Sequence, residues 1–346
     1  MHGNDKERLM TTERISLDHG SGGKIAHRLT AELLVPLFAN PILSDLNDGA
    51  ILTLEGGQRV AFSTDTFTVT PLFFPGGDIG ELAVNGTVND VAMCGARPLF
   101  ISLALIIEEG FSMADLQRIL ESIRRAAAAA GVTVVTGDTK VVPKGAADGL
   151  FINTSGIGLI PDHVHIGSTA AQPGDRVILS GTMADHGMTI LTQREGLSFD
   201  GALQSDSAPL NHMVARILAA SNKVHVLRDP TRGGVGTTLN EIAESSRAGI
   251  VLQESRLPVR DTVAGVCELL GFDPLYVANE GKLLAFVAAE DADAVLAAMR
   301  SDAYGKEACI IGEVTAEHPG QVVMETRIGG RRMVDMLTGE QLPRIC

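Results

Sequence analysis

Cys346 is the last residue of the chain, and its thiol follows a proline that interrupts regular structure. Pro343 lacks an amide donor and disfavours a helical conformation at Leu342, so residues 341–346 are predicted to leave the body of the protein as an extended arm. Six extended residues cover roughly 20 Å, enough to reach from a domain surface into a cleft. The sequence predicts a mobile, accessible thiol that can carry a bound group. The alternative is a frayed terminus that happens to end in Cys.

The charges next to this thiol oppose one another. The α-carboxylate of Cys346 disfavours a neighbouring thiolate, whereas the guanidinium of Arg344 favours it. The tail alone therefore predicts no unusual nucleophilicity.

Four carboxylates of the first half, Asp48, Asp65, Asp90 and Asp138, are predicted at turns or at the ends of helices and strands. Oxygen ligands of this kind suit Mg²⁺, which binds few protein carboxylates and keeps the rest of its shell for water and phosphate. Asp is also a common turn residue, so for each of the four an ordinary turn is the alternative.

A glycine-rich stretch at residues 20–23 precedes Lys24 and a helical pattern that runs from Ile25 to about Leu34. Backbone amides in such a stretch can wrap a phosphate, although the spacing differs from that of a Walker A loop. The alternative is a flexible entry loop.

Polar groups also interrupt an otherwise apolar helix predicted over residues 78–94, where Asn85 and Asn89 share one face and Asp90 follows directly.

In the second half, residues 228–235 are predicted to form a turn whose two glycines free amides for an anion. A further turn at residues 279–282 places Glu280 on a loop that can face the other half of the chain. The alternatives are solvated side chains and ordinary turns.

Length and composition set the frame for these residues. The 346 residues indicate about two domains, and no apolar run reaches the roughly 20 residues of a membrane helix. The formal charge of −14 disfavours general nucleic-acid binding. The four cysteines form no C-x-x-C pair, which disfavours a zinc site or a disulfide framework. The start lacks the apolar core of a secretion signal, so a cytoplasmic protein is predicted.

Hydrophobic periodicity predicts an α/β first domain and an α+β second domain. The first domain, residues 18–160, interleaves helices at 78–94 and 112–130 with strands at 59–63, 99–107, 132–136 and 150–160. Residues 161–174 are predicted to be a linker, 175–338 the second domain, 1–17 a loose extension and 339–346 a mobile tail.

From about Asp18 to Cys346 the chain resembles the ATP-using superfamily of aminoimidazole ribonucleotide synthetase, selenide water dikinase and thiamine-monophosphate kinase. Within it, the chain is similar to the HypE family of carbamoyl dehydratases, which act in NiFe-hydrogenase maturation. Motifs in the shared order carry the likeness: Gly20-Ser21-Gly22-Gly23-Lys24, Ser63-Thr64-Asp65-Thr66, Asn85-Gly86-Thr87-Val88-Asn89-Asp90, Thr136-Gly137-Asp138-Thr139-Lys140, Asp229-Pro230-Thr231-Arg232-Gly233-Gly234, Asn279-Glu280-Gly281 and Pro343-Arg344-Ile345-Cys346. The terminal Pro-Arg-Ile-Cys selects the HypE family, since a selenide dikinase would carry Cys or selenocysteine near the glycine-rich start.

The resemblance implies a two-domain synthetase-like fold whose first domain pairs its sheet with that of a second copy, giving a homodimer with flexible tails. It implies ATP and Mg²⁺ as cofactors. It also implies two partners, a carbamoyltransferase of the HypF family and a HypC–HypD complex that holds the iron centre. Neither nucleic acid nor a membrane is expected.

The implied reaction begins when the HypF-like partner loads a carbamoyl group onto Cys346. The carbamoyl oxygen then attacks the γ-phosphate of ATP and leaves as the carbon–nitrogen triple bond forms, giving a thiocyanate that supplies cyanide ligands. The resemblance assigns proton transfer to Glu280 and Lys140, and phosphate closure to Lys24. The implied Mg²⁺-ATP site consists of Asp48, Asp65, Asp90 and Asp138, with Thr66 and Asn89 as further nucleotide contacts.

Two other classes of function stay open from the sequence. One is another ATP-dependent enzyme of the superfamily that acts on a small diffusible substrate, for which turnover would not depend on Cys346. The other is a non-catalytic dimeric adaptor whose tail only docks a partner, which would hydrolyse no ATP.

Overall fold

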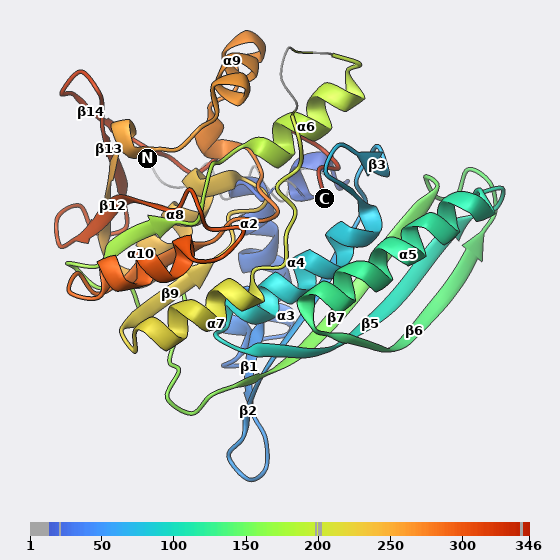
Figure 1. Ribbon diagram of the computed structural model, residues 1–346, viewed down its shortest axis with the longest axis horizontal. Coiled ribbons are helices and arrows are strands. Elements are labelled where there is room, and N and C mark those ends of the chain that lie inside the picture. The colour runs from blue at the N-terminus through green and yellow to red at the C-terminus, as the bar shows by residue number, and fades with distance from the viewer. Residues whose placement is uncertain (1–13, 21, 198, 200–202, 340–341) are drawn as a thin grey trace.

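The computed structural model describes residues 14–20, 22–197, 199, 203–339 and 342–346. Two sheets formed by successive parts of the chain make up the body of the molecule, and the chain passes from one to the other between residues 160 and 176 (Figure 1). The first is a mixed sheet with helices on one face, and the second belongs to an α+β unit. This architecture confirms the predicted fold class.

The first sheet has the strand order β1-β2-β7-β5-β6. Its strands are β1 (Ala50–Thr53), β2 (Arg59–Phe67), β5 (Arg97–Glu108), β6 (Thr133–Val142) and β7 (Leu150–Ile160). Only the β5–β6 pair is parallel. Helices α4 (Ile79–Met93) and α5 (Met113–Ala130) cover one face of the sheet, and the short hairpin of β3 (Phe73–Phe74) and β4 (Gly77–Asp78) leads into α4 (Figure 1).

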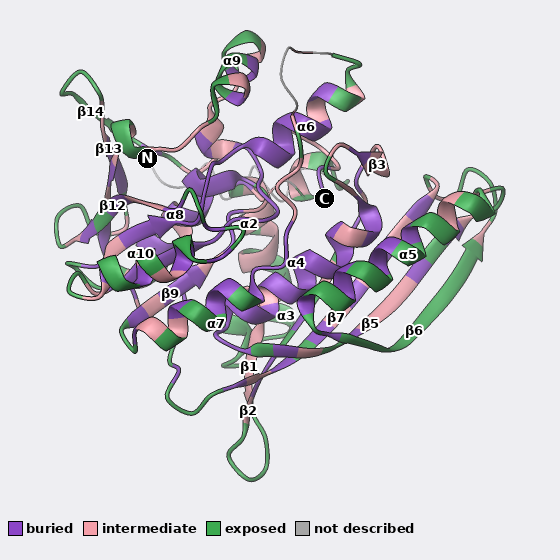
Figure 2. Cartoon of the chain, in the orientation of Figure 1, coloured by how far each residue is buried: buried purple, intermediate pink, exposed green. Residues whose placement is uncertain are grey.

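Local signals explain where the two long helices begin. The Asp78 carboxylate accepts hydrogen bonds from the amides of Gly80 and Glu81, and Ser112 Oγ accepts one from Asp115. These are the N-caps that the sequence predicts. Of the 15 residues of α4, 13 are buried, so this helix is the centre of the fold rather than a surface helix (Figure 2).

Two carboxylates lie elsewhere than predicted. Asp65 and Asp138 lie within strands rather than at strand ends, because β2 continues to Phe67 and β6 continues to Val142. Asp65 pairs with Thr154 of β7, and Asp138 pairs with Ala104 of β5. Cross-strand pairing thus extends both strands through polar residues of low strand propensity.

The second sheet has the order β14-β13-β10-β12-β8-β11-β9. Its strands are β8 (Arg176–Leu179), β9 (Val224–Arg228), β10 (Gly249–Gln253), β11 (Leu284–Val287), β12 (Cys309–Thr315), β13 (Val322–Glu325) and β14 (Arg331–Met333). The helices of this half are α6 (Asp185–Arg194), α7 (Asn211–Ala220), α8 (Gly234–Ser246), α9 (Asp261–Leu270) and α10 (Ala292–Arg300). Between α9 and β11, residues Pro274–Tyr276 form a 3₁₀ turn, which begins at Pro274 and is capped by the Asp273 carboxylate accepting from the Leu275 amide.

A shared apolar core joins the two halves. Val91 and Met93 at the end of α4 belong to the same buried cluster as Met213 of α7, Leu227 of β9 and Leu283.

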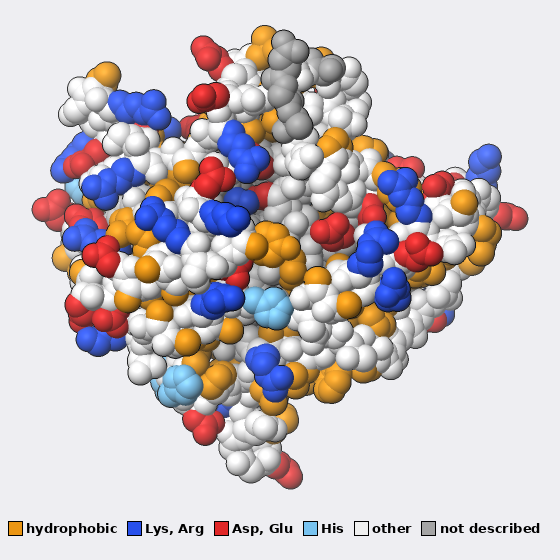
Figure 3. Space-filling view, viewed as in Figure 1, with side chains coloured by type: hydrophobic (Ala, Val, Ile, Leu, Met, Phe, Trp, Pro, Cys, Tyr) orange, Lys and Arg blue, Asp and Glu red, His pale blue; other side chains and the backbone are white. Residues whose placement is uncertain are grey.

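Before β1, the chain forms the short helix α2 (Lys24–Arg28), a π-helical turn (Leu29–Leu34) and α3 (Val35–Leu37). No helix in the described part of the chain has the length and apolar character to cross a membrane. On the face in Figure 3, Lys and Arg side chains are interspersed with Asp and Glu.

Candidate active site

The tail, residues 339–346, is described at Gly339 and over 342–346, and its last residues are docked against the body. The amides of Thr68 and Thr70, just beyond β2, donate to the main-chain oxygens of Cys346 (2.9 Å) and Arg344 (3.3 Å). The terminus lies beside β3 and α6 (Figure 1). Cys346 is only 9% exposed and Ile345 3%. The expectation of an accessible thiol is therefore wrong for this state of the protein.

The docked state has a physical cause that the tail sequence alone does not show. Ile345 joins the buried cluster that includes Val69, Ile190 and Ala278, and burial of such a side chain contributes about 1.5 to 3 kcal/mol. Ordering each backbone residue costs about 1 to 2 kcal/mol. The burial of Ile345 does not by itself offset this cost, so the packing of Cys346 and Leu342 and the hydrogen bonds of the tail also contribute to docking.

The thiol of Cys346 lies among charged groups of both halves. Burial raises its pKa to about 12, the Arg232 guanidinium opposes that rise, and the carboxylates of Glu280 and Asp65 add to it. Arg344 instead donates to the Thr68 carbonyl oxygen and pairs with Asp148. The cation that counters the charge of a Cys346 thiolate is therefore Arg232, and the sequence-based role of Arg344 is wrong.

Glu280 sits in a turn at 279–282 that is held from several sides. The Asn279 side chain accepts from the Ala184 amide (2.8 Å) and donates to the Pro230 oxygen (2.9 Å), and the Glu280 amide donates to Asp206 (3.0 Å). Gly281 is required because a Cβ there would overlap the Asp206 carbonyl oxygen. The backbone that carries Glu280 is thus fixed in place.

The Glu280 side chain itself is not fixed by hydrogen bonds at both oxygens. It is 4% exposed, and its Oε1 has no hydrogen-bond partner among the described residues. Burial raises the pKa of Glu280 well above its ordinary value, and the negative charges of Asp65 and Asp206 raise it further. A buried carboxyl with a free oxygen and a raised pKa is suited to proton transfer.

Asn89 ties α4 to the second half of the chain. Its side-chain nitrogen donates to the main-chain oxygens of Ala208 (3.0 Å) and Glu280 (3.3 Å), and its oxygen accepts from the Leu210 amide (2.8 Å). The geometry gives Asn89 a role in positioning the 279–282 turn. Its contact with a nucleotide remains a prediction.

Four carboxylates form an acidic cluster made up of Asp48, Asp65, Asp90 and Asp229. Burial raises the pKa of each, to about 6 for Asp229, and repulsion from Asp229, Asp65 and Asp48 raises that of Asp90 further. Arg228 pairs with Asp48 (2.7 Å), and Ser63 donates to Asp90 (2.7 Å). The cluster therefore holds more negative charge than its cationic neighbours neutralise.

This donor set fits a hard cation. Asp48 Oδ2 is buried without a hydrogen-bond partner, and oxygen ligands are those that Mg²⁺ prefers. Among the described residues, no three Asp, Glu, His or Cys side chains are arranged to hold a metal by themselves. The arrangement suits a cation that takes one or two carboxylates and completes its shell with water and phosphate.

A groove of about 600 Å³ separates the glycine-rich segment from the second half of the chain. Gly20, Gly22 and Ala26 line one side, and Arg228 and Arg232 line the other. Lys24 lies on the same segment, with an exposed side chain. The groove thus combines a glycine-rich segment, two guanidinium groups and a neighbouring acidic cluster, which together suit a phosphorylated ligand with its cation.

Two family models match most of the chain. Residues 46–160 match the family model for the AIR synthase related protein, N-terminal domain, and residues 172–325 match that for its C-terminal domain. The chain is 55% identical over 333 residues to the carbamoyl dehydratase HypE of Cupriavidus necator, covering 96% of this chain and 95% of that protein. The chain belongs to the HypE family.

Solved structures of the HypE family share the whole architecture. A HypE structure in complex with ATP is 53% identical, with a TM-score of 0.81 over 96% of this chain and all of that chain. A HypE–HypF complex is 47% identical, with a TM-score of 0.85 over 89% of this chain and 99% of that chain. The thiamine monophosphate kinase of Aquifex aeolicus, at 18% identity and a TM-score of 0.66, shares the fold alone.

We use the term cleft for the region that holds Cys346, Glu280, Arg232 and the acidic cluster. Three residues predicted for the HypE-type site lie apart from this cleft. Lys140 and Asp138 pair with each other on β6 (2.6 Å), with side chains 67% and 62% exposed. Thr66 is exposed on β2 and accepts from Asn153. Register places Thr66, Asn153 and Asp138 in one row across the sheet, on the face away from α4. Within one chain, the structure does not bring them to Glu280.

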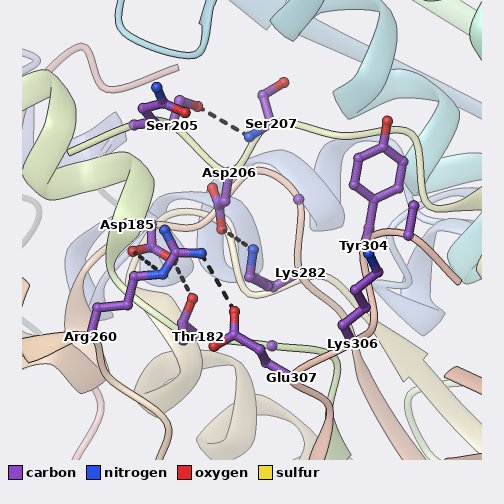
Figure 4. A pocket seen from close by; sticks show the side chains of 14 residues that line it. Thr182, Asp185, Ser205, Asp206, Ser207, Arg260, Lys282, Tyr304, Lys306 and Glu307 are labelled. Carbon is purple, nitrogen blue, oxygen red and sulfur yellow. Dashed lines mark hydrogen bonds and ion pairs between the residues drawn. The ribbon is translucent and has the colours of Figure 1, made fainter. Parts of the chain in front are cut away.

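A second hollow, of about 280 Å³, lies behind the 279–282 turn (Figure 4). Lys282 pairs there with Asp206 (3.0 Å), and Arg260 lies within 4 Å of Asp185 and Glu307. Asp206 thus contacts the turn twice, through the Glu280 amide and the Lys282 side chain, and helps to fix it.

Sequence reasoning missed several side chains of the HypE-type cleft. It noted the 228–235 turn only for its glycines, whereas Asp229 joins the acidic cluster and Arg232 acts on the Cys346 thiol. Both belong to the Asp-Pro-Thr-Arg-Gly-Gly motif, which is the signal that identifies them. His186 and Arg194 of α6 also contact the tail, and no motif marks them.

Proposed function

We propose that this protein is an ATP-dependent carbamoyl dehydratase that converts a carbamoyl group on Cys346 to a thiocyanate, which supplies cyanide ligands for NiFe-hydrogenase assembly. The observation that carries the proposal is the docked tail, which puts the Cys346 thiol in the electrostatic range of the buried Glu280. The HypE relatives named as carbamoyl dehydratases, and the HypE structure with ATP, support it.

The net reaction removes one oxygen and two N–H protons from the sulfur-bound carbamoyl group. The carbon–oxygen bond breaks, the carbon–nitrogen bond becomes triple, and the sulfur–carbon bond is kept. ATP supplies the phosphoryl group that turns the oxygen into a leaving group. Glu280 accepts one N–H proton, since its Oε1 is free and its pKa is raised. The Arg232 guanidinium stabilises negative charge that develops beside the sulfur.

The predicted cation ligands Asp48, Asp65 and Asp90 lie in the acidic cluster, so we propose that one or two of them hold Mg²⁺ next to the triphosphate. The groove residues Gly20 and Gly22 would contact the phosphates, with Lys24 closing over them. Asp138, Lys140 and Thr66 can complete the site only from a second copy of the chain.

A second copy suits the outer face of the first sheet. Its exposed apolar side chains include Phe62, Phe100, Ile106 and Ile157. Pairing two such faces would bury this surface and bring β6 of one copy towards the other. We propose a homodimer of this kind, in which Lys140 acts as the second proton-transfer group across the interface.

The partners and compartment follow from the same proposal. A HypF-family carbamoyltransferase would load Cys346, which the HypE–HypF complex of a relative supports. A HypC–HypD complex would receive the cyanide. Cys94, Cys267, Cys309 and Cys346 are all free, which suits a reducing cytoplasm. A small diffusible substrate is disfavoured because the docked Cys346 thiol lies within the electrostatic range of Glu280.

Calorimetric titration with Mg²⁺-ATP tests the nucleotide site. Asp65→Ala should weaken Mg²⁺-dependent binding by roughly tenfold or more, because it removes a carboxylate from the acidic cluster. Asp138→Ala should also weaken binding if the second copy completes the site. The control is Asp162→Ala, which changes an exposed carboxylate outside the cluster. Wild-type affinity in folded Asp65→Ala and Asp138→Ala variants would remove the proposed site.

A further inference from the structure

Four successive main-chain oxygens of the tail are held by hydrogen bonds. The Arg194 guanidinium donates to the oxygens of Pro343 (2.6 Å) and Arg344 (2.8 Å). His186 Nε2 donates to the oxygen of Ile345 (2.8 Å). The Thr68 amide donates to that of Cys346 (2.9 Å). None of these contacts involves the sulfur, so a group attached to it leaves them intact.

Arg194 also fixes the surface on which the tail docks. Its Nε and Nη2 donate to the Thr70 oxygen (3.2 and 2.9 Å), while the Thr70 amide donates to the Arg344 oxygen. One planar guanidinium therefore joins the tail to the segment after β2. A lysine cannot reproduce this fork, because its ammonium group is a single point of contact.

His186 is placed by contacts on its other side. It is fully buried, its Nδ1 lies 2.8 Å from Ser205 Oγ, and its ring packs edge-on against Phe74. Since Nε2 must carry the proton to donate to Ile345, Nδ1 accepts from the Ser205 hydroxyl. Ser205 in turn accepts from the Ser207 amide (3.1 Å), which Figure 4 shows at the rim of the second hollow.

Helix α6, which carries both residues, is tied to the turn that holds Glu280. The Ala184 amide at its start donates to Asn279, and the Gly187 amide donates to the Ala278 oxygen (3.1 Å). Gly187 permits this approach, because a Cβ there would overlap the Val277 side chain. The same helix thus contacts the Glu280 turn with its first residues and the tail with His186 and Arg194.

We propose that α6 is a latch for the tail, in which Arg194 and His186 are positioning residues that hold the main chain of residues 343–345 and so aim the Cys346 thiol at Glu280. The latch sets how long the thiol stays in the cleft rather than in solvent, where a loading partner can reach it. The latch rests on the proposed function only for the reason why the tail docks. Its main test, alkylation of Cys346, uses neither ATP nor a carbamoyl donor.

The test is the rate at which iodoacetamide alkylates Cys346 at mildly alkaline pH, followed by mass spectrometry of the C-terminal peptide. Alkylation requires an exposed thiolate, and the docked thiol is buried with a raised pKa. Arg194→Ala removes charged hydrogen bonds to two tail carbonyls and should raise the rate by about tenfold or more. Arg194→Lys should give an intermediate rate. Gln193→Ala, on the exposed neighbour in α6, should leave the rate unchanged.

Cys94 reports folding in the same sample, because it is buried in a cluster that contains no tail residue. It should stay protected in every variant. His186→Gln provides a second route to the same answer, since it retains one donor but loses the ring packed between Ser205 and Phe74, and should raise the Cys346 rate less than Arg194→Ala does. A wild-type alkylation rate of Cys346 in Arg194→Ala, with Cys94 protected, would overturn the latch.

A kinetic measurement separates positioning from general structural support. If the dehydratase activity holds, Arg194→Ala should slow single-turnover conversion of the loaded tail, leave Mg²⁺-ATP affinity unchanged, and allow loading by the partner at least as fast as in the wild type. Equal losses in ATP affinity and conversion would contradict a role confined to the tail. If Arg194→Ala is alkylated faster but the wild-type protein has no dehydratase activity, the latch stands and the proposed function is rejected.

Discussion

The cleft and the outer face of the first sheet both carry charged residues that the sequence singles out, but these residues are buried in the cleft and exposed on the outer face. In the cleft, Glu280 and the acidic cluster are desolvated, and their pKa values are raised by burial and by one another. On β6, Asp138 and Lys140 neutralise each other in solvent, and that pairing lowers the pKa of Asp138. The buried, charge-repelling groups of the cleft form a candidate site within one chain. The exposed ion pair on β6 is already satisfied in solvent, which is why we propose a role for it only in a dimer.

The largest effect that would sharpen this comparison is expected at Glu280. Glu280→Gln keeps the shape of the side chain but removes the proton acceptor, so nitrile formation on a loaded tail should slow by about 10²-fold or more while loading continues. Because burial raises the pKa of Glu280, the wild-type rate should rise with pH through a range above the ordinary glutamate value. Single-turnover assays across pH measure both. The exposed Glu290→Gln is the control, and a wild-type rate in Glu280→Gln would exclude Glu280 as the base.

A smaller effect tests whether β6 acts from the second copy. Lys140→Ala should slow dehydration by about tenfold or more, in the range of general acid–base catalysis. Mixing it with Glu280→Gln and allowing subunits to exchange gives mixed dimers in which one of the two sites has both residues intact. If Lys140 acts across the interface, the mixture should recover about a quarter of wild-type activity, since half of the dimers are mixed. A mixture as inactive as its components would place the two residues in the same chain.

The smallest effect concerns stability. Burial and three neighbouring carboxylates raise the pKa of Asp90 above its unfolded value, so the folded state loses stability as pH rises from about 4 through the raised pKa. Asp90→Asn should remove that cost, while its side-chain oxygen still accepts from Ser63. The Tm without ligand should rise by about 2–8 °C at neutral pH, and the gain should shrink near pH 4. Asp162→Asn is the control, and a Tm equal to or below wild type would contradict the account.

The two regions also differ in how far the sequence predicts them. Helix starts at Asp78 and Ser112 depend on local hydrogen bonds, so their motifs were sufficient. The extents of β2 and β6 depend on pairing with distant strands, so the sequence predicts strand ends at polar residues through which both strands in fact continue. The position of the tail depends on Thr68, His186 and Arg194, which lie far away in sequence and carry no motif. The sequence therefore predicts which residues are candidates for the site, but it does not predict that the tail is docked.

The family resemblance located the chemistry more completely than composition or spacing did. Cys346, Glu280, Asp65 and Asp90 were named from separate motifs, and the structure brings them within electrostatic range of one another. Lys140 was named by the same route, yet it lies on the outer face. A motif therefore names candidate residues without showing whether they meet in one chain, and a contribution of Lys140 from a second copy is part of the proposal.

The central claim is that Cys346 carries the group that is dehydrated. Mass spectrometry of the C-terminal peptide tests it directly, after incubation with a HypF-family carbamoyltransferase and then with Mg²⁺-ATP. The peptide should first gain a carbamoyl group and then lose the mass of one water molecule, and Cys346→Ala should show neither change while it still binds ATP. A Cys346→Ala protein that acquires a carbamoyl group and converts it to a nitrile on another residue would contradict the account.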